Sequence, residues 1–137
     1  MRLIPYLIFN GQCDEAFAFY AQVLRGKIIA RSTYGDMPAM PGHPQMPAET
    51  LGQIAHVHLV ADGASLMGGD GPIHPGDDNI VNVDVDSIEE AERIFAGLSA
   101  DGQVKAPIGE TPWAHRWGML ADRYGKPWMV NCMKSPS

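Results

Sequence analysis

Hydrophobic and polar residues alternate along this chain with two periods, one typical of helices and one typical of strands. A spacing of three and four residues predicts an amphipathic helix over residues 13–25 and another after Ser87. The first apolar stripe comprises Ala16, Phe19, Tyr20 and Val23. The second comprises Ala91, Ile94, Phe95 and Leu98. Each stripe should face a sheet.

Short apolar runs bounded by turn residues predict the strands. We expect them at residues 3–10, 27–34, 53–61, 64–69, 79–86, 103–109, 116–121 and 127–132. Asp62-Gly63 predicts a tight hairpin turn, and Ser87 with Glu90 predicts a capping box at the start of the second helix. The proline-rich stretch at 35–50 has no periodicity and should be a loop.

The order strand, helix and three strands therefore occurs twice. When the helices are superposed, Glu15 falls on Glu90 and Ala16 on Ala91, which indicates an internal repeat. The sequence predicts an α+β fold of two βαβββ modules in a single domain, with a pocket at the seam between them. The predicted parts are a first module at 1–69, a linker at 70–78, a second module at 79–132 and a tail at 133–137.

Composition narrows the classes of partner. The 137 residues carry a formal charge of −6, which argues against a nucleic-acid surface. No apolar run is long enough to span a membrane, and residues 1–11 favour a strand over a signal peptide. Cys13 and Cys132 are too few for a disulfide framework, so we expect reduced thiols in a cytoplasmic protein. No G-x-G-x-x-G motif opens a helix, so the sequence contains no dinucleotide or S-adenosylmethionine motif.

Several stretches resemble one known superfamily. They are YLIFNGQCDEAFAFY at 6–20, IAHVHL at 54–59, SLMGGD at 65–70, VDSIEEAERIFAGL at 85–98 and WAHRWGMLADRYGKPWMVN at 113–131. Together they resemble the vicinal oxygen chelate superfamily of glyoxalase, bleomycin-resistance and extradiol dioxygenase proteins. Within it the chain is most similar to the PhnB-like, 3-demethylubiquinone-9 3-methyltransferase-like group. The resemblance implies two βαβββ modules in an incomplete barrel of mixed sheets, a fold that hosts both enzymes and binding proteins.

The resemblance also implies where a divalent metal would be held, on the first and last strands of each module. Those places fall on Pro5, Met67, Ile80 and Met129, none of which ligates such a metal. We therefore expect no metal at the inherited site and no cofactor.

Strand alternation predicts which side chains line the cup between the modules. Val81, Val83 and Val85 should face the second helix, which turns Asn82 and Asp84 inward. The candidate ligand-binding residues are Leu7, Phe9, His56, His58, Met67, Asn82, Asp84, Trp113, Trp117, Met129 and Asn131. The alternative is that these side chains simply fill the barrel.

His56 and His58 lie two residues apart and should share a strand face. Either His56 is buried and hydrogen-bonded while His58 is semi-exposed, or the two form, with Asp70, His74 or His115, a zinc site that the family does not share. Trp113, His115 and Trp117 predict an aromatic edge for a planar ligand or for a dimer contact. Glu110 with His115 is the weak candidate for an acid–base pair.

These observations favour a protein that binds a small apolar or aromatic molecule without the inherited metal, as a homodimer, with the 35–50 loop as part of a lid. The alternative is a metal-dependent lyase, isomerase or dioxygenase with a non-inherited histidine site. A scaffold with a filled barrel and no ligand remains a third hypothesis, and the sequence leaves open whether the protein is an enzyme.

Overall fold

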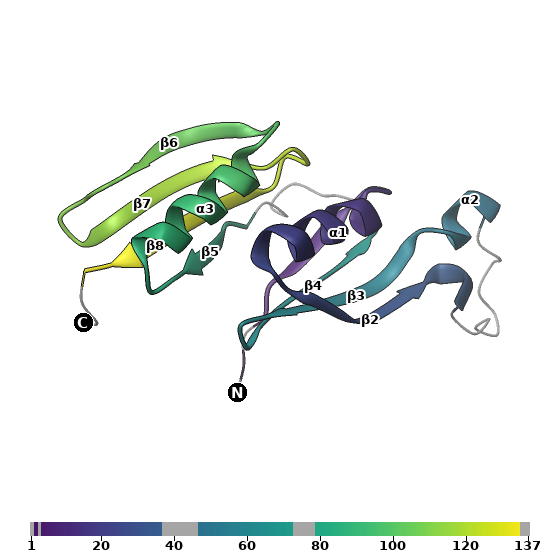
Figure 1. The fold of residues 1–137 in the computed structure, drawn as a ribbon. Helices are drawn as coiled ribbons and strands as arrows, with labels where there is room; N and C mark the ends of the chain where they lie inside the picture. The colour runs from purple at the N-terminus through teal and green to yellow at the C-terminus, as the bar shows by residue number, and fades with distance from the viewer. Residues whose placement is uncertain (1, 3, 37–46, 73–78, 135–137) are drawn as a thin grey trace. The chain divides into compact units, whose positions relative to one another are not determined.

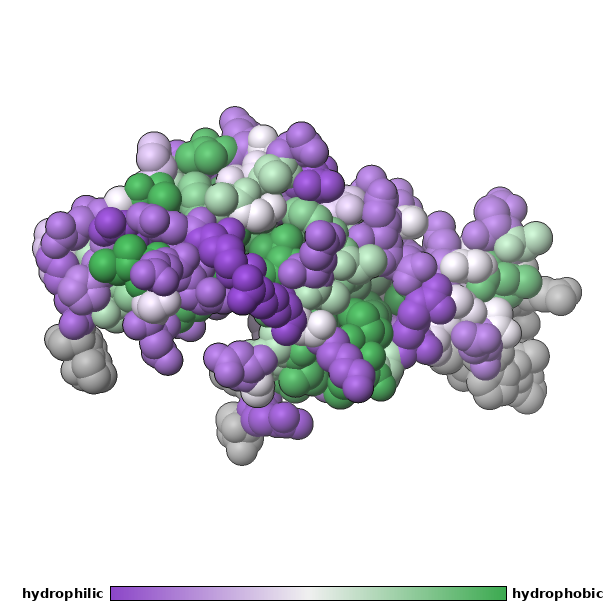
Figure 2. Space-filling model, viewed as in Figure 1, coloured by the Kyte–Doolittle hydropathy of each residue, from purple (hydrophilic) through white to green (hydrophobic). Residues whose placement is uncertain are grey.

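A computed structural model describes residues 2, 4–36, 47–72 and 79–134, which form two compact units, Met1–His74 and Pro75–Ser137. Each unit has one four-stranded sheet with a long helix packed on one face (Figure 1). The boundary lies inside the predicted linker at 70–78. In the view of Figure 2, hydrophilic residues cover much of the surface and apolar residues appear in patches between them.

The N-terminal unit repeats the predicted order. Its elements are β1 (Tyr6–Phe9), α1 (Cys13–Leu24), β2 (Lys27–Thr33), β3 (Ile54–Ala61) and β4 (Ala64–Asp70). The strand order is β1-β4-β3-β2, with β1 parallel to β4 and the other pairs antiparallel. The predicted 35–50 loop is not irregular throughout: a 3-10 turn η1 (Tyr34–Asp36) overlaps its start and a one-turn helix α2 (Ala48–Leu51) overlaps its end. Its residues 37–46 are outside the described residues.

The C-terminal unit has the same topology. Its elements are β5 (Val81–Asp84), α3 (Ile88–Ser99), β6 (Gln103–Gly109), β7 (Ala114–Ala121) and β8 (Pro127–Met133). The strand order is β5-β8-β7-β6, again with one parallel pair, between β5 and β8. The prediction of two βαβββ modules is confirmed.

The predicted turn and cap also form. Asp62 and Gly63 both have positive φ, 50° and 78°, as a two-residue hairpin of the primed type requires. Ser87 Oγ accepts a hydrogen bond of 3.1 Å from the Glu90 amide, the first half of the predicted capping box. The Glu90 carboxylate forms an ion pair with Arg93 one turn along α3.

The two helices differ in how well their sequence identified the buried face. All four residues of the predicted α3 stripe are buried. In α1 the buried residues are Cys13, Ala16, Phe17 and Tyr20, so the prediction that Phe19 and Val23 face the sheet was wrong. Apolar side chains surround much of α1, and packing against β1 and β4 selects Phe17, whose ring lies 6.2 Å from that of Phe9.

None of the helices in the described part of the chain is long and apolar enough to cross a membrane.

Candidate functional site: the open faces of the two sheets

The face of the N-terminal sheet that packs on α1 can be identified from a glycine. A Cβ added to Gly68 would lie 2.6 Å from the Phe17 ring, so this position of β4 faces the helix. Leu7 and Val57 are paired with Gly68 on either side, and paired residues share a face. Residues one position along the strands from Gly68, Leu7 and Val57 lie on the opposite face. These are Tyr6, His56, His58 and Met67.

We call this second face the N-terminal open face. Its residues are Tyr6, Ile8, His56, His58, Ser65 and Met67. His56, His58 and Met67 lie on the side of the sheet that strand alternation indicated, and their binding of a ligand stays a prediction. The predictions for Leu7 and Phe9 were wrong: Phe9 is 1% exposed and lies against Phe17 and Tyr20 of α1. β1 is apolar on both faces, so its sequence does not show which set of side chains meets the helix.

Tyr6 reaches across β4 to His56. Their rings stack with centroids 5.8 Å apart, and Tyr6 Oη lies 3.4 Å from His56 Nδ1. The path is open because Gly69 lies beneath it: a Cβ there would be 3.0 Å from Tyr6 Oη and 2.9 Å from the Ala55 carbonyl oxygen. Partial burial raises the pKa of Tyr6, so its hydroxyl keeps its proton near neutral pH.

The second histidine has a different partner. His58 Nε2 lies 2.8 Å from Ser65 Oγ, a contact between neighbouring strands. In a nucleophilic serine site, a third group would orient the histidine through its other nitrogen. No described residue bonds His58 Nδ1, so the contact positions the two side chains without completing such a triad.

In the C-terminal sheet a glycine likewise marks the face that packs on α3. A Cβ on Gly118 would lie 2.6 Å from the Phe95 ring, so Gly118 and its partner Val130 face α3. The residues next to Gly118 and Val130 along their strands point to the opposite face. Together with the residues of β5 that pair with them, they form the C-terminal open face. They are Asn82, Asp84, Trp117, Met119, Met129 and Asn131. All five of the predicted site residues in this set therefore lie on one side of the sheet, and Met119 joins them.

Two side-chain pairs organise the C-terminal open face. Asn131 Nδ2 donates a 2.5 Å hydrogen bond to Asn82 Oδ1 on the neighbouring strand. The Trp113 and Trp117 rings meet edge to face with centroids 6.1 Å apart, and Trp113 is 51% exposed. The structure thus brings together the two tryptophans that the sequence singled out, whereas Trp128 is buried in the core.

The proposed acid–base pair of Glu110 and His115 does not form. Glu110 Oε2 lies 2.8 Å from Lys134 Nζ, and this hydrogen-bonded ion pair lowers the pKa of Glu110. An ionised, lysine-paired carboxylate has no proton to donate near neutral pH. No hydrogen bond joins Glu110 to His115 among the described residues, and His115 is exposed.

The inherited metal positions can be compared with the observed register. Met67 is paired with Tyr6, and Met129 is paired with Asn82. Neither pair supplies the imidazole or carboxylate ligands that a divalent metal of this superfamily needs, so the residues present do not fit the group. Within residues 4–36, 47–72 and 79–134, no three histidine, cysteine or acidic side chains gather as a metal site. His43 and His74 lie outside the described residues.

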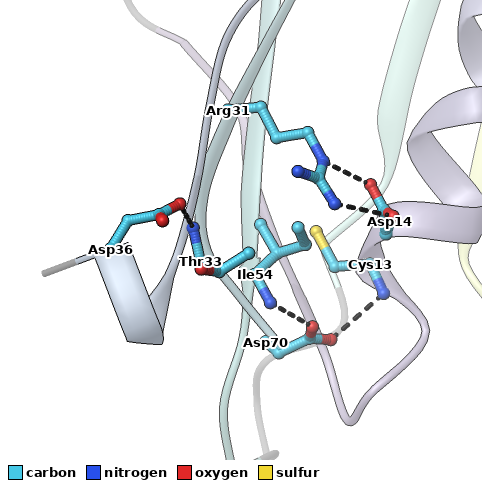
Figure 3. Close-up of polar contacts among 7 residues, drawn as sticks. All are labelled: Cys13, Asp14, Arg31, Thr33, Asp36, Ile54 and Asp70. Carbon is cyan, nitrogen blue, oxygen red and sulfur yellow. Dashed lines mark hydrogen bonds and ion pairs between the residues drawn. The ribbon is translucent and has the colours of Figure 1, made fainter. Parts of the chain in front are cut away.

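Sequence reasoning missed the role of Asp70 as the centre of a buried network. This carboxylate is 3% exposed and accepts hydrogen bonds from the amides of Gly11, Cys13 and Ile54 at 2.8, 3.1 and 2.9 Å. Figure 3 shows the bonds from Cys13 and Ile54. It ties the end of β4 to the start of α1 and the start of β3. Since its acceptor capacity serves backbone amides, Asp70 is a structural residue and not the third metal ligand considered from the sequence.

Cys13 lies beside this network and is fully buried. Burial, reinforced by the negative charge of Asp70, raises the pKa of Cys13 to about 12. The thiol therefore stays protonated near neutral pH and is not an activated nucleophile. Cys13 and Cys132 are both free, as expected.

Comparisons with known proteins agree with this architecture. The chain matches the family model described as 3-demethylubiquinone-9 3-methyltransferase over residues 1–131. It is 32% identical to Protein YjdN of Escherichia coli K12, over 98% of this chain and 97% of that one.

Solved structures give the same result for the fold. The crystal structure of protein PA1353 from Pseudomonas aeruginosa matches with a TM-score of 0.85 and 40% identity, over 97% of this chain and 98% of that one. The PhnB protein from Bacillus cereus matches with a TM-score of 0.74 and 23% identity, over 96% and 99% of the two chains. Structures of the glyoxalase/bleomycin resistance/dioxygenase fold also match over nearly the whole chain, which confirms the predicted fold.

Proposed function

The chain belongs to the 3-demethylubiquinone-9 3-methyltransferase family, and from that premise we propose that it binds a small apolar or aromatic molecule on the open faces of its sheets, without a metal at the inherited positions. The observation that carries this proposal is the composition of the C-terminal open face. Trp117 and two methionines adjoin a hydrogen-bonded pair of asparagines there, with Trp113 at the edge. Aromatic and thioether side chains with a few fixed polar groups are typical of small-molecule sites.

The N-terminal open face supports the same proposal with different chemistry. Tyr6 offers a ring already stacked on His56, and Met67 and Ser65 lie beside His58. These side chains are held by contacts within the sheet, so a ligand would meet groups whose positions are already fixed.

Tryptophan fluorescence with a panel of aromatic metabolites tests the proposal. A ligand on the C-terminal open face should quench Trp113 and Trp117 but not Trp128, which is buried on the helix side of β8. The variant Trp117→Phe should reduce the quenching, and the variant Phe19→Leu, on the half-buried side of α1, serves as the control. If no compound changes the emission or the thermal stability of the wild-type protein, the binding proposal is wrong and a scaffold without a ligand is favoured.

The shared face of His56 and His58 favours a second candidate, a metal-dependent lyase, isomerase or dioxygenase with a non-inherited site. Two histidines of one strand could supply two ligands, with Tyr6 beside them. Metal analysis of untagged protein separates the two candidates: stoichiometric zinc, iron or manganese that is lost in His56→Ala would support the enzyme and overturn the metal-free proposal.

We also propose that the protein is a cytoplasmic homodimer. Trp113 and Met133 are large apolar side chains with 51% and 40% exposure, as expected for residues that a second copy covers. The free thiols of Cys13 and Cys132 suit a reducing compartment. Light scattering during gel filtration tests the oligomeric state, and a monomer at micromolar concentration would contradict the first part of this proposal.

A further inference from the structure

Three residues form a row across the C-terminal open face. Asp84 of β5 is paired with Asn131 of β8, and Asn131 is paired with Trp117 of β7. Neighbouring strands are about 4.8 Å apart, so the backbones of Asp84 and Trp117 are separated by about 10 Å. The row therefore places a carboxylate at one end, an amide in the middle and an indole at the other end.

The central amide is turned toward the carboxylate end of the row. Asn131 is 7% exposed, and its Nδ2 donates to Asn82 Oδ1, which lies on the same strand as Asp84. No bond to a described residue uses Asn131 Oδ1. The row thus combines a carboxylate and an amide oxygen, both acceptors, and the space above it on the β7 side is left to Trp117.

The indole of Trp117 is not covered from the next strand. Its partner on β6 is Gly109, and a Cβ added there would meet no atom within 4 Å. Trp113 touches Trp117 edge to face and is itself half exposed. A bound group above Asn131 would therefore have aromatic surface on one side.

Among the described residues that the register places on this face, Asp84 supplies a negative charge. Asp84 forms no ion pair with any described residue, and the residues that the register places on this face include no lysine or arginine. Arg116 is paired with Glu92 and Lys134 with Glu110. The whole chain has a formal charge of −6, which adds to the attraction for a cation.

We propose that the row of Asp84, Asn131 and Trp117 binds the ammonium group of a small organic cation, an inference that rests on the proposed binding function and specifies its ligand class. An ammonium group interacts with an aromatic ring at up to about 6 Å and with a carboxylate at about 4 Å. Trp117 and Asp84 have backbones about 10 Å apart on one face, so one ammonium group between their side chains can reach both. Asn131 lies between these two residues in the row, and its Oδ1 accepts no hydrogen bond from a described residue.

Choline and its uncharged isostere 3,3-dimethylbutan-1-ol provide the test, at matched ionic strength. In titrations of ¹⁵N-labelled protein, choline should shift the indole signal of Trp117 and the backbone signals of Asp84 and Asn131 along saturable curves. The indole signal of buried Trp128 should not move. The alcohol, with the same shape and no charge, should bind at least about tenfold more weakly, the factor equivalent to about 1.4 kcal/mol.

Variants separate the parts of the row. Asp84→Asn should weaken choline binding about tenfold and leave the alcohol unaffected, whereas Asp86→Asn, two residues along and beyond the end of β5, should change neither. Trp117→Leu should weaken choline binding about fivefold, because the cation loses its aromatic partner.

Equal binding of choline and the alcohol would overturn this inference and leave the proposed function intact. So would choline binding that is unchanged in Asp84→Asn. If neither compound shifts these signals while the aromatic panel quenches Trp117, the cation inference also fails and the broader proposal stands. If the panel fails as well, both are wrong.

Discussion

In the N-terminal unit the first turn of α1 is held by a carboxylate from a distant strand, whereas in the C-terminal unit α3 is capped by the residue that precedes it. Asp70, at the end of β4, binds the amides of Gly11 and Cys13. Ser87 binds the Glu90 amide three residues on. Counting from the equivalent Met67 and Met129, the position of Asp70 corresponds to Cys132 in β8, which cannot serve as such a cap.

The two units thus share a backbone topology without sharing the interactions that stabilise it. A local cap needs only the few residues around the helix start. The Asp70 network needs β3, β4 and α1 to be assembled first, because its donors lie at the start of α1 and at the start of β3, and Figure 3 shows one from each, Cys13 and Ile54. The N-terminal unit should therefore depend more on a single side chain than the C-terminal unit does.

The largest expected effect is the loss of Asp70. In Asp70→Ala, three amides lose a charged acceptor, and the bonds from Cys13 and Ile54 are buried, so the free energy of unfolding should fall by about 4 kcal/mol. Ser87→Ala removes one exposed cap and should cost about 1 kcal/mol. Urea denaturation followed by circular dichroism measures both.

Asp70→Asn keeps one acceptor oxygen, so its loss of unfolding free energy should lie between the losses of Asp70→Ala and Ser87→Ala. Equal losses for Asp70→Ala and Ser87→Ala would contradict the contrast drawn between the units.

Substitution of the glycines that face the helices should give a smaller difference in stability between the two units. In Gly68→Ala the new methyl would lie 2.6 Å from the Phe17 ring and 2.7 Å from the Leu7 carbonyl oxygen, so a ring movement alone cannot relieve the clash. The expected loss of unfolding free energy is about 2 kcal/mol. In Gly118→Ala the closest atom belongs to the Phe95 ring and the nearest backbone atom is 3.0 Å away, so about 1 kcal/mol is expected.

The same denaturation measurement, made on both variants, decides the order. A greater loss in Gly118→Ala would show that the sheet of the N-terminal unit adjusts more readily than its contacts indicate.

The effect that is smallest at neutral pH, and that develops only in alkaline solution, is a pH dependence that arises in the N-terminal unit. Burial raises the pKa of Cys13 to about 12 in the folded protein, while an unfolded thiol loses its proton near 9. Between these values the unfolded state binds fewer protons than the folded state, so the free energy of unfolding should fall as the pH rises. The slope should be about 1.4 kcal/mol for each pH unit at its steepest.

The fall in unfolding free energy between pH 8 and pH 11 should disappear in Cys13→Ala and remain in Cys132→Ala. An unchanged slope in Cys13→Ala would assign the alkaline loss of stability to other groups.

The candidate site was partly predictable. Asn82 and Asp84 alternate with valines along β5, and His56 and His58 alternate with Val57 and Leu59 along β3, so their side of the sheet followed from the pattern. Leu7 and Phe9 were assigned to the wrong side because β1 is apolar at every position from Leu7 to Phe9. Such a strand has no alternation from which its buried face could be read.

The sequence also did not predict which charged residues form ion pairs. Glu110 is close in sequence to His115, yet it pairs with Lys134, which β8 brings beside it. Arg31 likewise pairs with Asp14 across β2 and α1 (Figure 3). Proximity along the chain indicates little about which charges meet once strands from distant segments lie side by side.

The amino-acid sequence by itself determined the two modules, their element order, the hairpin at Asp62-Gly63 and the cap at Ser87, because each depends on residues within one short segment. Only the tertiary structure decided which faces of β1 and α1 are buried, which partner Glu110 takes, and that Asp70 anchors the N-terminal unit. It also aligned Asp84, Asn131 and Trp117 in one row, since their register depends on three strands pairing at once. These features arise from contacts between distant segments, whose geometry no local pattern encodes.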